Sequence, residues 1–443
     1  MTTVNNIFIL SSVINHMLSL NKKLFTCFVD YTKAFDLIVR ETIWYKLIKL
    51  GLRGNILNII KSFYLQLKSS VKCNTTISDT FLCTLGVAQG DCLLFTMYIH
   101  DLEETLMLKG HLCIDIHMLK LYVLLYADDI VLMSETAEDL QNALNILKSY
   151  CDHWKLTVNV NKTKSMIFRK GGRVRGNLVF KYGGQELEIV TKFSYLGVIF
   201  SPAGSFYQTF ETLSRQALTA FFRLKSYLYK FTNITAEHKL NLFDKLILPI
   251  LNYGSQVWGF SDSQTLELKF CKHILGVRSQ TQNNFIYAES FRYPLTCYRI
   301  VNIVKYWFNK KCNDIKLLRL FYNIMLGDLN SMPDKPSWVR YLIFIFESLG
   351  FYHGWLFQGV GNENEFVSLL WKRSRDTFLQ SINGQLKELP RASTYILFHN
   401  YGYKSYLNIL RIQKYRHTLT RFRHSAHRLA IETGRWHKPY KIP

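Results

Sequence analysis

Two adjacent carboxylates, Asp128 and Asp129, stand between two apolar runs of the sequence. Residues 122–126 predict a buried strand, residues 127–129 a tight turn, and residues 130–133 the returning strand. Burying two carboxylates together is costly unless a cation neutralises them, and all-oxygen ligation suits Mg²⁺ or Mn²⁺. The alternative is an ordinary solvated turn, because Asp is common in turns.

A third carboxylate follows another predicted strand. Residues 24–29 are apolar and predict a strand that delivers Asp30 at its end. Side chains at strand ends can point into a cleft, so Asp30 is a further candidate site residue. Asp36, six residues later, falls on the following turn, and we interpret it as structural.

Helical patterns account for most of the other elements. Residues 4–20, 41–50, 54–68 and 135–154 predict helices, and residues 193–198 predict an alternating strand. Residues 205–260 predict helices in which basic side chains alternate with Tyr and Phe. Helical, basic sequence continues beyond about residue 290, and residues 327–336 are the best linker candidate. The basic residues that we expect to face a partner are Arg215, Arg223, Lys225, Lys230, Lys239, Arg411, Lys414, Arg416, Arg421, Arg423, Arg428 and Arg435.

Composition narrows the class of protein. The 443 residues carry 55 Lys and Arg against 32 Asp and Glu, a net charge of +23 that is spread along the chain. A positive charge distributed in this way favours a nucleic-acid partner, because phosphate neutralisation and counterion release drive binding. A membrane surface or simple solubility are the alternatives. No apolar run of about 18 residues predicts a membrane span, and no signal peptide is recognisable. The nine cysteines form no C-x-x-C pair, so we expect reduced thiols and an intracellular protein of the cytoplasm or nucleus.

Five motifs in order carry a family resemblance. The chain resembles the reverse transcriptase of a non-LTR (LINE-type) retrotransposon. This resemblance implies an α+β fold: a right-hand polymerase palm of antiparallel sheet and packed helices over residues 1–200, with residual fingers. A helical thumb over 201–290 and a helical, basic C-terminal region over 291–443 would follow. The motifs are residues 28–36, 86–91, 126–129, 161–164 and 195–197.

The resemblance also implies roles for particular residues. Asp30, Asp128 and Asp129 would be the catalytic carboxylates that hold two Mg²⁺ or Mn²⁺ ions for nucleotidyl transfer. Phe35 would lie beneath the incoming sugar and favour deoxynucleotides, although core packing is an equal alternative. Gln89 and Gly90 would contact the template–nucleotide pair. Lys162 would contact the pyrophosphate, although a solvated loop position is the alternative. Tyr195, Leu196 and Gly197 would hold the primer end.

The sequence departs from the family pattern in two places. Residue 88 is Ala where a basic or polar residue is common, and three residues of a Ser-Pro-apolar insert are missing after Gly90. A helix there could still pack, since three residues turn its apolar face by only about 60°. The chain opens where the fingers would end, which suggests an internal piece of a longer element. We therefore expect an RNA-directed DNA polymerase that uses an RNA template, a DNA primer or target and deoxynucleotides. The alternatives are an inactive remnant that still binds RNA or DNA, and a relic without function.

Overall fold

The computed structural model describes residues 2–88, 90–116, 119–172, 178–231, 234–260, 265–312, 316–331, 337–389, 392–398, 403–410 and 412–424. The chain divides into two compact units. Unit 1 comprises residues 1–206 and 315–335, and unit 2 comprises residues 207–314 and 336–443. The division into functional regions 1–200, 201–290 and 291–443 stays a prediction.

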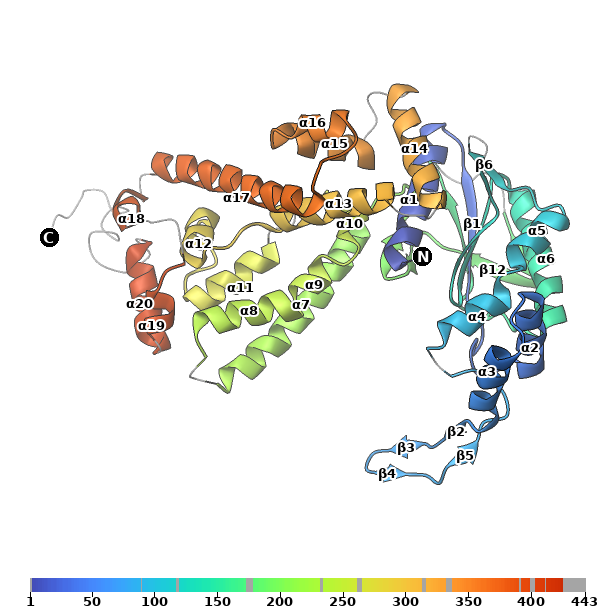
Figure 1. The fold of residues 1–443 in the computed structure, drawn as a ribbon. Coiled ribbons are helices and arrows are strands. Elements are labelled where there is room, and N and C mark those ends of the chain that lie inside the picture. The colour runs from blue at the N-terminus through green and yellow to red at the C-terminus, as the bar shows by residue number, and fades with distance from the viewer. Residues whose placement is uncertain are drawn as a thin grey trace. The chain divides into compact units, whose positions relative to one another are not determined.

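Unit 1 is a mixed helical and sheet structure, in agreement with the predicted α+β class (Figure 1). Its elements are α1 (Thr3–Ser19), β1 (Leu24–Val29), α2 (Arg40–Lys49), α3 (Asn55–Leu65), β2 (Lys68–Ser69), β3 (Lys72–Cys73), β4 (Thr76–Ile77), β5 (Phe81–Leu82), α4 (Cys92–Ile99), α5 (Leu102–Leu108), β6 (Ile114–Ile116), β7 (Leu119–Leu121), β8 (Val123–Tyr126), β9 (Asp129–Ser134), α6 (Ala137–Trp154), β10 (Lys164–Phe168), β11 (Phe180–Tyr182), β12 (Gln185–Ile189), β13 (Phe193–Tyr195), β14 (Val198–Phe200) and α14 (Lys316–Ser331).

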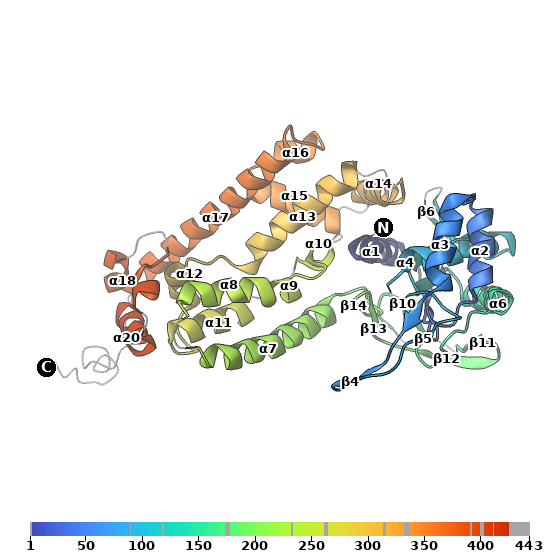
Figure 2. The ribbon, with the colours of Figure 1, turned by 60° about the horizontal axis from the view of Figure 1, so that its bottom comes forward.

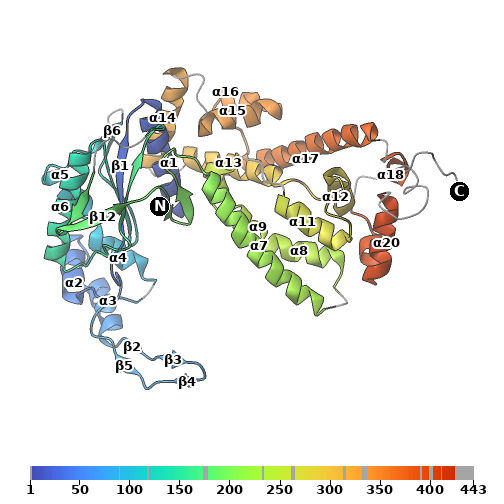
Figure 3. The same ribbon diagram turned by 180° about the vertical axis from the view of Figure 1, so that it is seen from behind.

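A six-stranded sheet with the order β11-β12-β10-β1-β9-β8 forms the centre of unit 1 (Figure 3). β1 pairs antiparallel with both β9 and β10, and β8 pairs antiparallel with β9. The prediction of a wholly antiparallel sheet is wrong at one place, because β10 and β12 are parallel. The chain between them passes first through the edge strand β11, so β12 returns beside β10 in the same direction.

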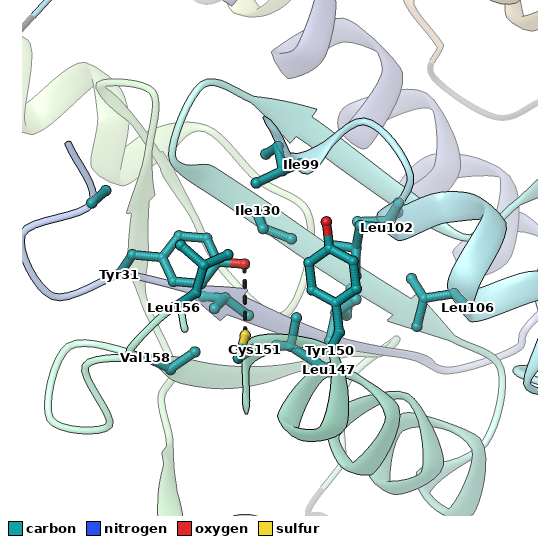
Figure 4. Close-up of a cluster of buried hydrophobic side chains, with 14 of the residues drawn as sticks. Tyr31, Ile99, Leu102, Leu106, Ile130, Leu147, Tyr150, Cys151, Leu156 and Val158 are labelled. Carbon is teal, nitrogen blue, oxygen red and sulfur yellow. Dashed lines mark hydrogen bonds between the residues drawn. The ribbon is translucent and has the colours of Figure 1, made fainter. Parts of the chain in front are cut away.

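All six residues of β1 are buried, so both faces of the sheet are covered. Alternate residues of a strand point to opposite faces. Phe25, Cys27 and Val29 therefore share one face, and they belong to a core that includes α2, α4 and α6. Figure 4 shows part of this core, where the Cys151 thiol donates a 3.9 Å hydrogen bond to the Tyr31 hydroxyl.

Two helices that lie far apart in the sequence pair beside the sheet in unit 1. α1 packs against α14, and His16 Nδ1 lies 2.9 Å from Asp328 Oδ2, across 312 residues of sequence. α14 buries Leu318 and Phe321. The predicted linker over residues 327–336 is therefore wrong up to Ser331, which ends α14, and residues 332–336 lie outside the described residues. Apolar burial of this helix outweighs the turn tendency of Gly327.

A narrow β arm extends from unit 1 between α3 and α4 (Figures 1 and 2). β2 pairs with β5 at its base, and β3 pairs with β4 near its tip. The prediction of a helix over residues 54–68 is right only as far as Leu65, where α3 ends and the arm begins. The other predicted helices in unit 1, over residues 4–20, 41–50 and 135–154, are confirmed within three residues at each end.

Unit 2 is helical in the part that the structure describes. The helices α7 to α10 fall within residues 205–260, where helices are predicted. No described helix of either unit is long and apolar enough to cross a membrane. The helices of unit 2 are α7 (Tyr207–Tyr229), α8 (Ala236–Leu246), α9 (Leu248–Leu251), α10 (Ser255–Trp258), α11 (Thr265–Leu275), α12 (Asn283–Ser290), α13 (Leu295–Cys312), α15 (Trp338–Ser348), α16 (Tyr352–Leu356), α17 (Glu363–Glu388), α18 (Ser393–Phe398), α19 (Tyr406–Ile409) and α20 (Gln413–Arg423).

The basic C-terminal residues do not all face solvent. Arg416 is buried, and Arg423 Nε donates a 2.7 Å hydrogen bond to the buried Glu289. Lys414 and Arg421 are exposed. Arg411, Arg428 and Arg435 lie outside the described residues. The prediction that this segment is a nucleic-acid-binding patch is therefore wrong for Arg423, because its side chain bonds Glu289 of α12.

Candidate functional site

The three predicted carboxylates come from neighbouring strands at one edge of the sheet. Asp30 follows β1 directly, and the register pairs Val29 with Ile130 of β9. Asp128 lies in the two-residue turn between β8 and β9, and Asp129 begins β9 opposite Tyr126. Ala127 in this turn has a φ of 51°, which costs a residue with a Cβ about 1 kcal/mol. The structure therefore brings Asp30, Asp128 and Asp129 to one place.

The carboxylates affect one another electrostatically. Partial withdrawal from solvent raises the pKa of Asp129 to about 6, and the negative charges of Asp128 and Asp30 add to this. The pKa of Asp30 is also raised, first by withdrawal from solvent, while Lys162 opposes the shift and Asp128 adds to it. A divalent cation would relieve this repulsion, so the donor set suits one. Among the residues that the structure describes, no three acidic, His or Cys side chains close around a metal position by themselves.

A loop from residues 157 to 163 supports Asp30. Asn159 donates a 2.8 Å backbone hydrogen bond to the Asp30 oxygen, and the Asp30 amide donates a 3.2 Å bond to the buried Thr163 hydroxyl. This loop carries Lys162, whose ammonium lies 3.9 Å from Asp30 Oδ2 and whose side chain is 71% exposed. Lys162 thus lies beside the acidic cluster, and its contact with pyrophosphate stays a prediction. Thr163 was not predicted from the sequence.

The predicted primer-contact residues form a hairpin and not a continuous strand. β13 and β14 pair around Leu196 and Gly197, which have φ values of 48° and 77°. Two positive φ values are typical of a type I′ hairpin turn, so the prediction of one alternating strand over 193–198 is wrong. The hairpin packs on β1 through stacked rings of Phe193 and Phe28, 4.3 Å apart.

Tyr195 links this hairpin to the acidic cluster. Its side chain is buried, and its hydroxyl has no hydrogen-bond partner in the structure. Burial raises the pKa of Tyr195 well above its ordinary value, and the nearby charges of Asp129 and Tyr126 raise it further. The structure therefore brings Tyr195 close to the carboxylates, with Leu196 and Gly197 at the hairpin tip.

Phe35 belongs to a turn that is locked against the Gly86 loop. The Phe35 ring packs on Phe95 of α4 at 5.2 Å between centroids and is partly buried. Its backbone oxygen accepts a 2.8 Å hydrogen bond from Val87. A Cβ on Gly86 would lie 2.6 Å from the Asp36 oxygen and 2.7 Å from the Phe35 oxygen. Asp36 therefore contributes its backbone to this contact, as its structural interpretation predicts.

Three polar residues that the sequence did not single out hold the same loop. Arg40 donates hydrogen bonds to the backbone oxygens of Gly86 at 2.8 Å, Tyr64 at 2.5 Å and Leu85 at 3.3 Å. The Tyr64 hydroxyl donates a 2.5 Å bond to Asp91, and Asp91 accepts from the Leu94 amide at the start of α4. An Arg at the start of a helix and an Asp at a helix cap are weak sequence signals, because both are usually exposed.

The shortened Gln-Gly loop still leads into a packed helix. Gln89 lies outside the described residues, and Ala88 is exposed. Gly90 has a φ of 99°, and a Cβ there would meet nothing within 4 Å. Asp91 caps α4, which buries Leu94, Phe95, Tyr98 and Ile99, as expected for a helix that tolerates the missing residues. The glycine that close packing requires is thus Gly86 and not Gly90.

Sequence comparison assigns the class of the first 200 residues. Residues 3–200 match the family model described as reverse transcriptase (RNA-dependent DNA polymerase). The matched part contains the sheet, the three carboxylates, the Gly86 loop and the β13–β14 hairpin. This part of the chain is a reverse transcriptase domain of the kind found in non-LTR retrotransposons.

The relatives agree with this class. The chain is 25% identical over 264 residues to the RNA-directed DNA polymerase from mobile element jockey of Drosophila funebris, covering 57% of this chain and 28% of that protein. It is 24% identical over 247 residues to a probable RNA-directed DNA polymerase from transposon BS of Drosophila melanogaster, covering 53% and 26%. The chain thus spans about a quarter of the length of these curated relatives.

Comparison of this fold with solved structures finds weak similarity to telomerases. The structure of telomerase from Candida albicans with a fragment of telomeric RNA is 14% identical, covering 72% of this chain and 54% of that one, with a TM-score of 0.29. A telomerase from Candida tropicalis gives a TM-score of 0.31. These scores are too low to define a shared arrangement of domains.

Proposed function

We propose that this chain is the RNA-directed DNA polymerase part of a non-LTR mobile element, with a polymerase palm in unit 1. One observation carries the proposal: Asp30 at the end of β1 lies beside the β8–β9 hairpin that bears Asp128 and Asp129. A primer 3′-hydroxyl would attack the α-phosphate of a deoxynucleotide, and pyrophosphate would leave. RNA as template and DNA as primer or target follow from the class of the relatives.

Asp30, Asp128 and Asp129 are proposed to hold Mg²⁺ or Mn²⁺, with substrate oxygens completing the coordination. When bound, such ions lower the pKa of the attacking hydroxyl and stabilise charge on the leaving oxygen. The mutual repulsion of the three carboxylates supports this assignment. The nearness of Asp30 to the exposed ammonium of Lys162 supports pyrophosphate contact by that lysine.

The other residues have positioning roles in this proposal. Phe35 would lie under the sugar of the incoming nucleotide, held by Phe95 and by the Gly86 loop. Gln89 and Gly90 would contact the template–nucleotide pair. The hairpin tip at Leu196 and Gly197, with Tyr195 behind it, would hold the primer end near the carboxylates.

Primer extension tests the proposal. The 443-residue chain receives an RNA template, an annealed DNA primer, deoxynucleotides and either Mg²⁺ or Mn²⁺. We expect extension by the parent, and a loss of at least about a hundredfold in Asp128→Asn, because electrostatic stabilisation at the reacting phosphate is lost. Asp79→Asn is the matched control, since Asp79 is an exposed carboxylate on the β arm. Extension that survives in Asp128→Asn would refute the assignment of the site.

A second candidate function is nucleic-acid binding without synthesis, which the net charge of +23 favours. Binding of a DNA–RNA duplex by folded protein that extends no primer under any metal condition would support it.

A further inference from the structure

A small cavity lined by cations lies within unit 2. Its volume is about 160 Å³. Helices α7, α8 and α11 run side by side around it, and α20 lies against α11 (Figure 2). The polar residues that line it are Lys225 from α7, Lys239 from α8, His273 from α11, and Gln413 and Arg416 from α20. Four elements therefore direct basic side chains toward one space.

None of the described residues that line the cavity is acidic. The buried acids of unit 2 are paired elsewhere. Glu267 accepts a 3.1 Å hydrogen bond from Arg292, which also bonds Asp244. Glu289 is bonded by Arg423 at 2.7 Å. The buried Arg292 and the half-buried Arg423 thus have carboxylate partners, whereas the lining of this cavity contains none among the described residues.

Arg416 is the most deeply placed of these cations. It is only 2% exposed, and its Nε has no hydrogen-bond partner in the structure. One terminal nitrogen donates a long 3.4 Å bond to the Leu410 oxygen. A buried guanidinium normally has its donors satisfied by a carboxylate or phosphate. Arg416 therefore has a donor that can bind an anion at the wall of this cavity.

The electrostatics of the lining agree with this geometry. Burial lowers the pKa of Lys239, and the charge of Arg416 lowers it further. Burial, followed by the charges of Lys225 and Lys239, lowers the pKa of His273. Burial also lowers the pKa of Arg416 itself. Burial is the first cause of each shift, and a bound anion would oppose it by favouring the charged form of each side chain.

We propose that this cavity is an oxyanion site that takes a phosphate group of a nucleic-acid backbone, with Arg416 at its base and Lys225 and Lys239 at its sides. The rim favours a polynucleotide over free phosphate. Tyr229 and Phe231 line the same cavity and are 79% and 57% exposed, so their rings are available to stack on sugars or bases. This proposal rests on the proposed function. It adds to that function a particular phosphate-binding site for the nucleic acid in unit 2.

The first test measures the salt dependence of binding to a DNA–RNA duplex by fluorescence anisotropy, without nucleotides. We expect Lys239→Gln to weaken binding about tenfold at low salt, as for loss of one charged hydrogen bond. The slope of log K against log[salt] should fall in size by about 0.9, as for loss of one phosphate contact. Lys387→Gln is the matched control, because Lys387 is an exposed lysine of α17 in the same unit and does not line the cavity. Equal slopes for Lys239→Gln and Lys387→Gln would overturn the proposal.

The second test measures how far each lysine is protected from acylation, with mass spectrometry as the readout. Duplex should protect Lys225 and Lys239 and leave Lys387 unprotected, in both the parent and the folded Asp128→Asn variant. Protection by inorganic phosphate but not by duplex would retain the oxyanion site and overturn its assignment to nucleic acid. Protection by neither would overturn the site itself.

These outcomes separate the inference from the proposed function. Failure of primer extension with intact duplex protection would refute catalysis alone. Extension by the parent with unprotected lysines would refute the phosphate site alone. Arg416→Lys is a further variant, which retains the charge at the base of the cavity. If it folds, we expect weaker duplex binding, because a single ammonium replaces the planar guanidinium.

Discussion

The Nε atom of Arg40 donates a 2.8 Å hydrogen bond to the backbone oxygen of Gly86. Arg40 begins α2 and Gly86 begins the Gln-Gly loop, so this bond ties the loop to the body of unit 1. The same guanidinium also bonds Tyr64 and Leu85, and Tyr64 reaches the cap residue of α4. A single buried cation thus sets the position of both ends of the loop.

We expect Arg40→Gln to lower the free energy of unfolding by about 2–3 kcal/mol, because buried carbonyl groups lose their charged donor. Urea denaturation measures this change. Arg53→Gln, at an exposed arginine between α2 and α3, should change it by less than about 0.5 kcal/mol. Similar denaturation midpoints for the two variants would contradict a stabilising role for the hydrogen bonds of Arg40.

Gly86→Ala and Gly90→Ala form a matched pair of loop variants. Both glycines have positive φ, so each substitution carries a backbone cost of about 1 kcal/mol. Only Gly86→Ala also drives a Cβ to 2.6 Å from the Asp36 oxygen, so it should be the more destabilising by about 2 kcal/mol or more. Thermal denaturation of both variants checks the difference. Equal losses of stability in the two variants would contradict the prediction, because they would mean that the turn at Phe35 moves away from the Cβ without cost.

Metal-free stability should depend on the ionisation of Asp129. Its pKa is raised to about 6 in the folded chain, above its value of about 3.9 when unfolded. The folded state therefore binds more protons between these values, and stability falls as pH rises from about 4 to about 6. We expect Asp129→Asn to raise the melting temperature at pH 7 in EDTA by about 2–4 °C, after allowance for solvent screening.

Melting curves between pH 4 and pH 8 measure this effect, with Asp79→Asn as the control. Saturating Mn²⁺ should stabilise the parent at pH 7 more than Asp129→Asn, since a cation favours the ionised cluster. A parent whose stability rises from pH 4 to pH 6 while that of Asp129→Asn does not would show the repulsion to be absent.

Lys46 is a buried lysine whose loss should destabilise unit 1 severely. It is 1% exposed and bonds the Tyr98 oxygen at 2.5 Å, Asp101 at 2.7 Å and the Tyr150 hydroxyl at 2.8 Å. Lys46→Ala leaves Asp101 without its cation, so we expect a loss of about 3–5 kcal/mol in the free energy of unfolding.

Lys49→Ala, at an exposed lysine one turn along α2, should stay within about 0.5 kcal/mol of the parent. Guanidinium denaturation of both variants makes the comparison. A small loss for Lys46→Ala would mean that Asp101 finds another donor or water.

The sequence predicted those features of unit 1 that depend on local pattern. β1, the β8–β9 hairpin and α6 have clear apolar periodicity, and the turn at Asp128 lies between two apolar strands. These elements carry the three carboxylates. The prediction that β1 lies beside the β8–β9 hairpin therefore also predicted that the three carboxylates lie close together.

The features that the sequence did not predict depend on distant contacts. The turn at Leu196 needs a positive φ at a residue that usually avoids it, and packing of Phe193 and Tyr195 on Phe28 compensates. The ion pair of Arg423 depends on Glu289, which lies 134 residues away in the sequence, and Arg416 is buried. Charge and helical periodicity alone do not distinguish such residues from solvent-facing cations.

The pairing of α1 with α14 makes the folding of unit 1 depend on synthesis of unit 2. His16 and Asp328 are 312 residues apart, so a ribosome working at about 5–20 residues per second adds the second about 15–60 s after the first. Residues 207–314 are synthesised during this interval, before the helix that packs on α1 exists. The side of α1 that packs against α14 therefore stays open to chaperones and other chains until α14 is made.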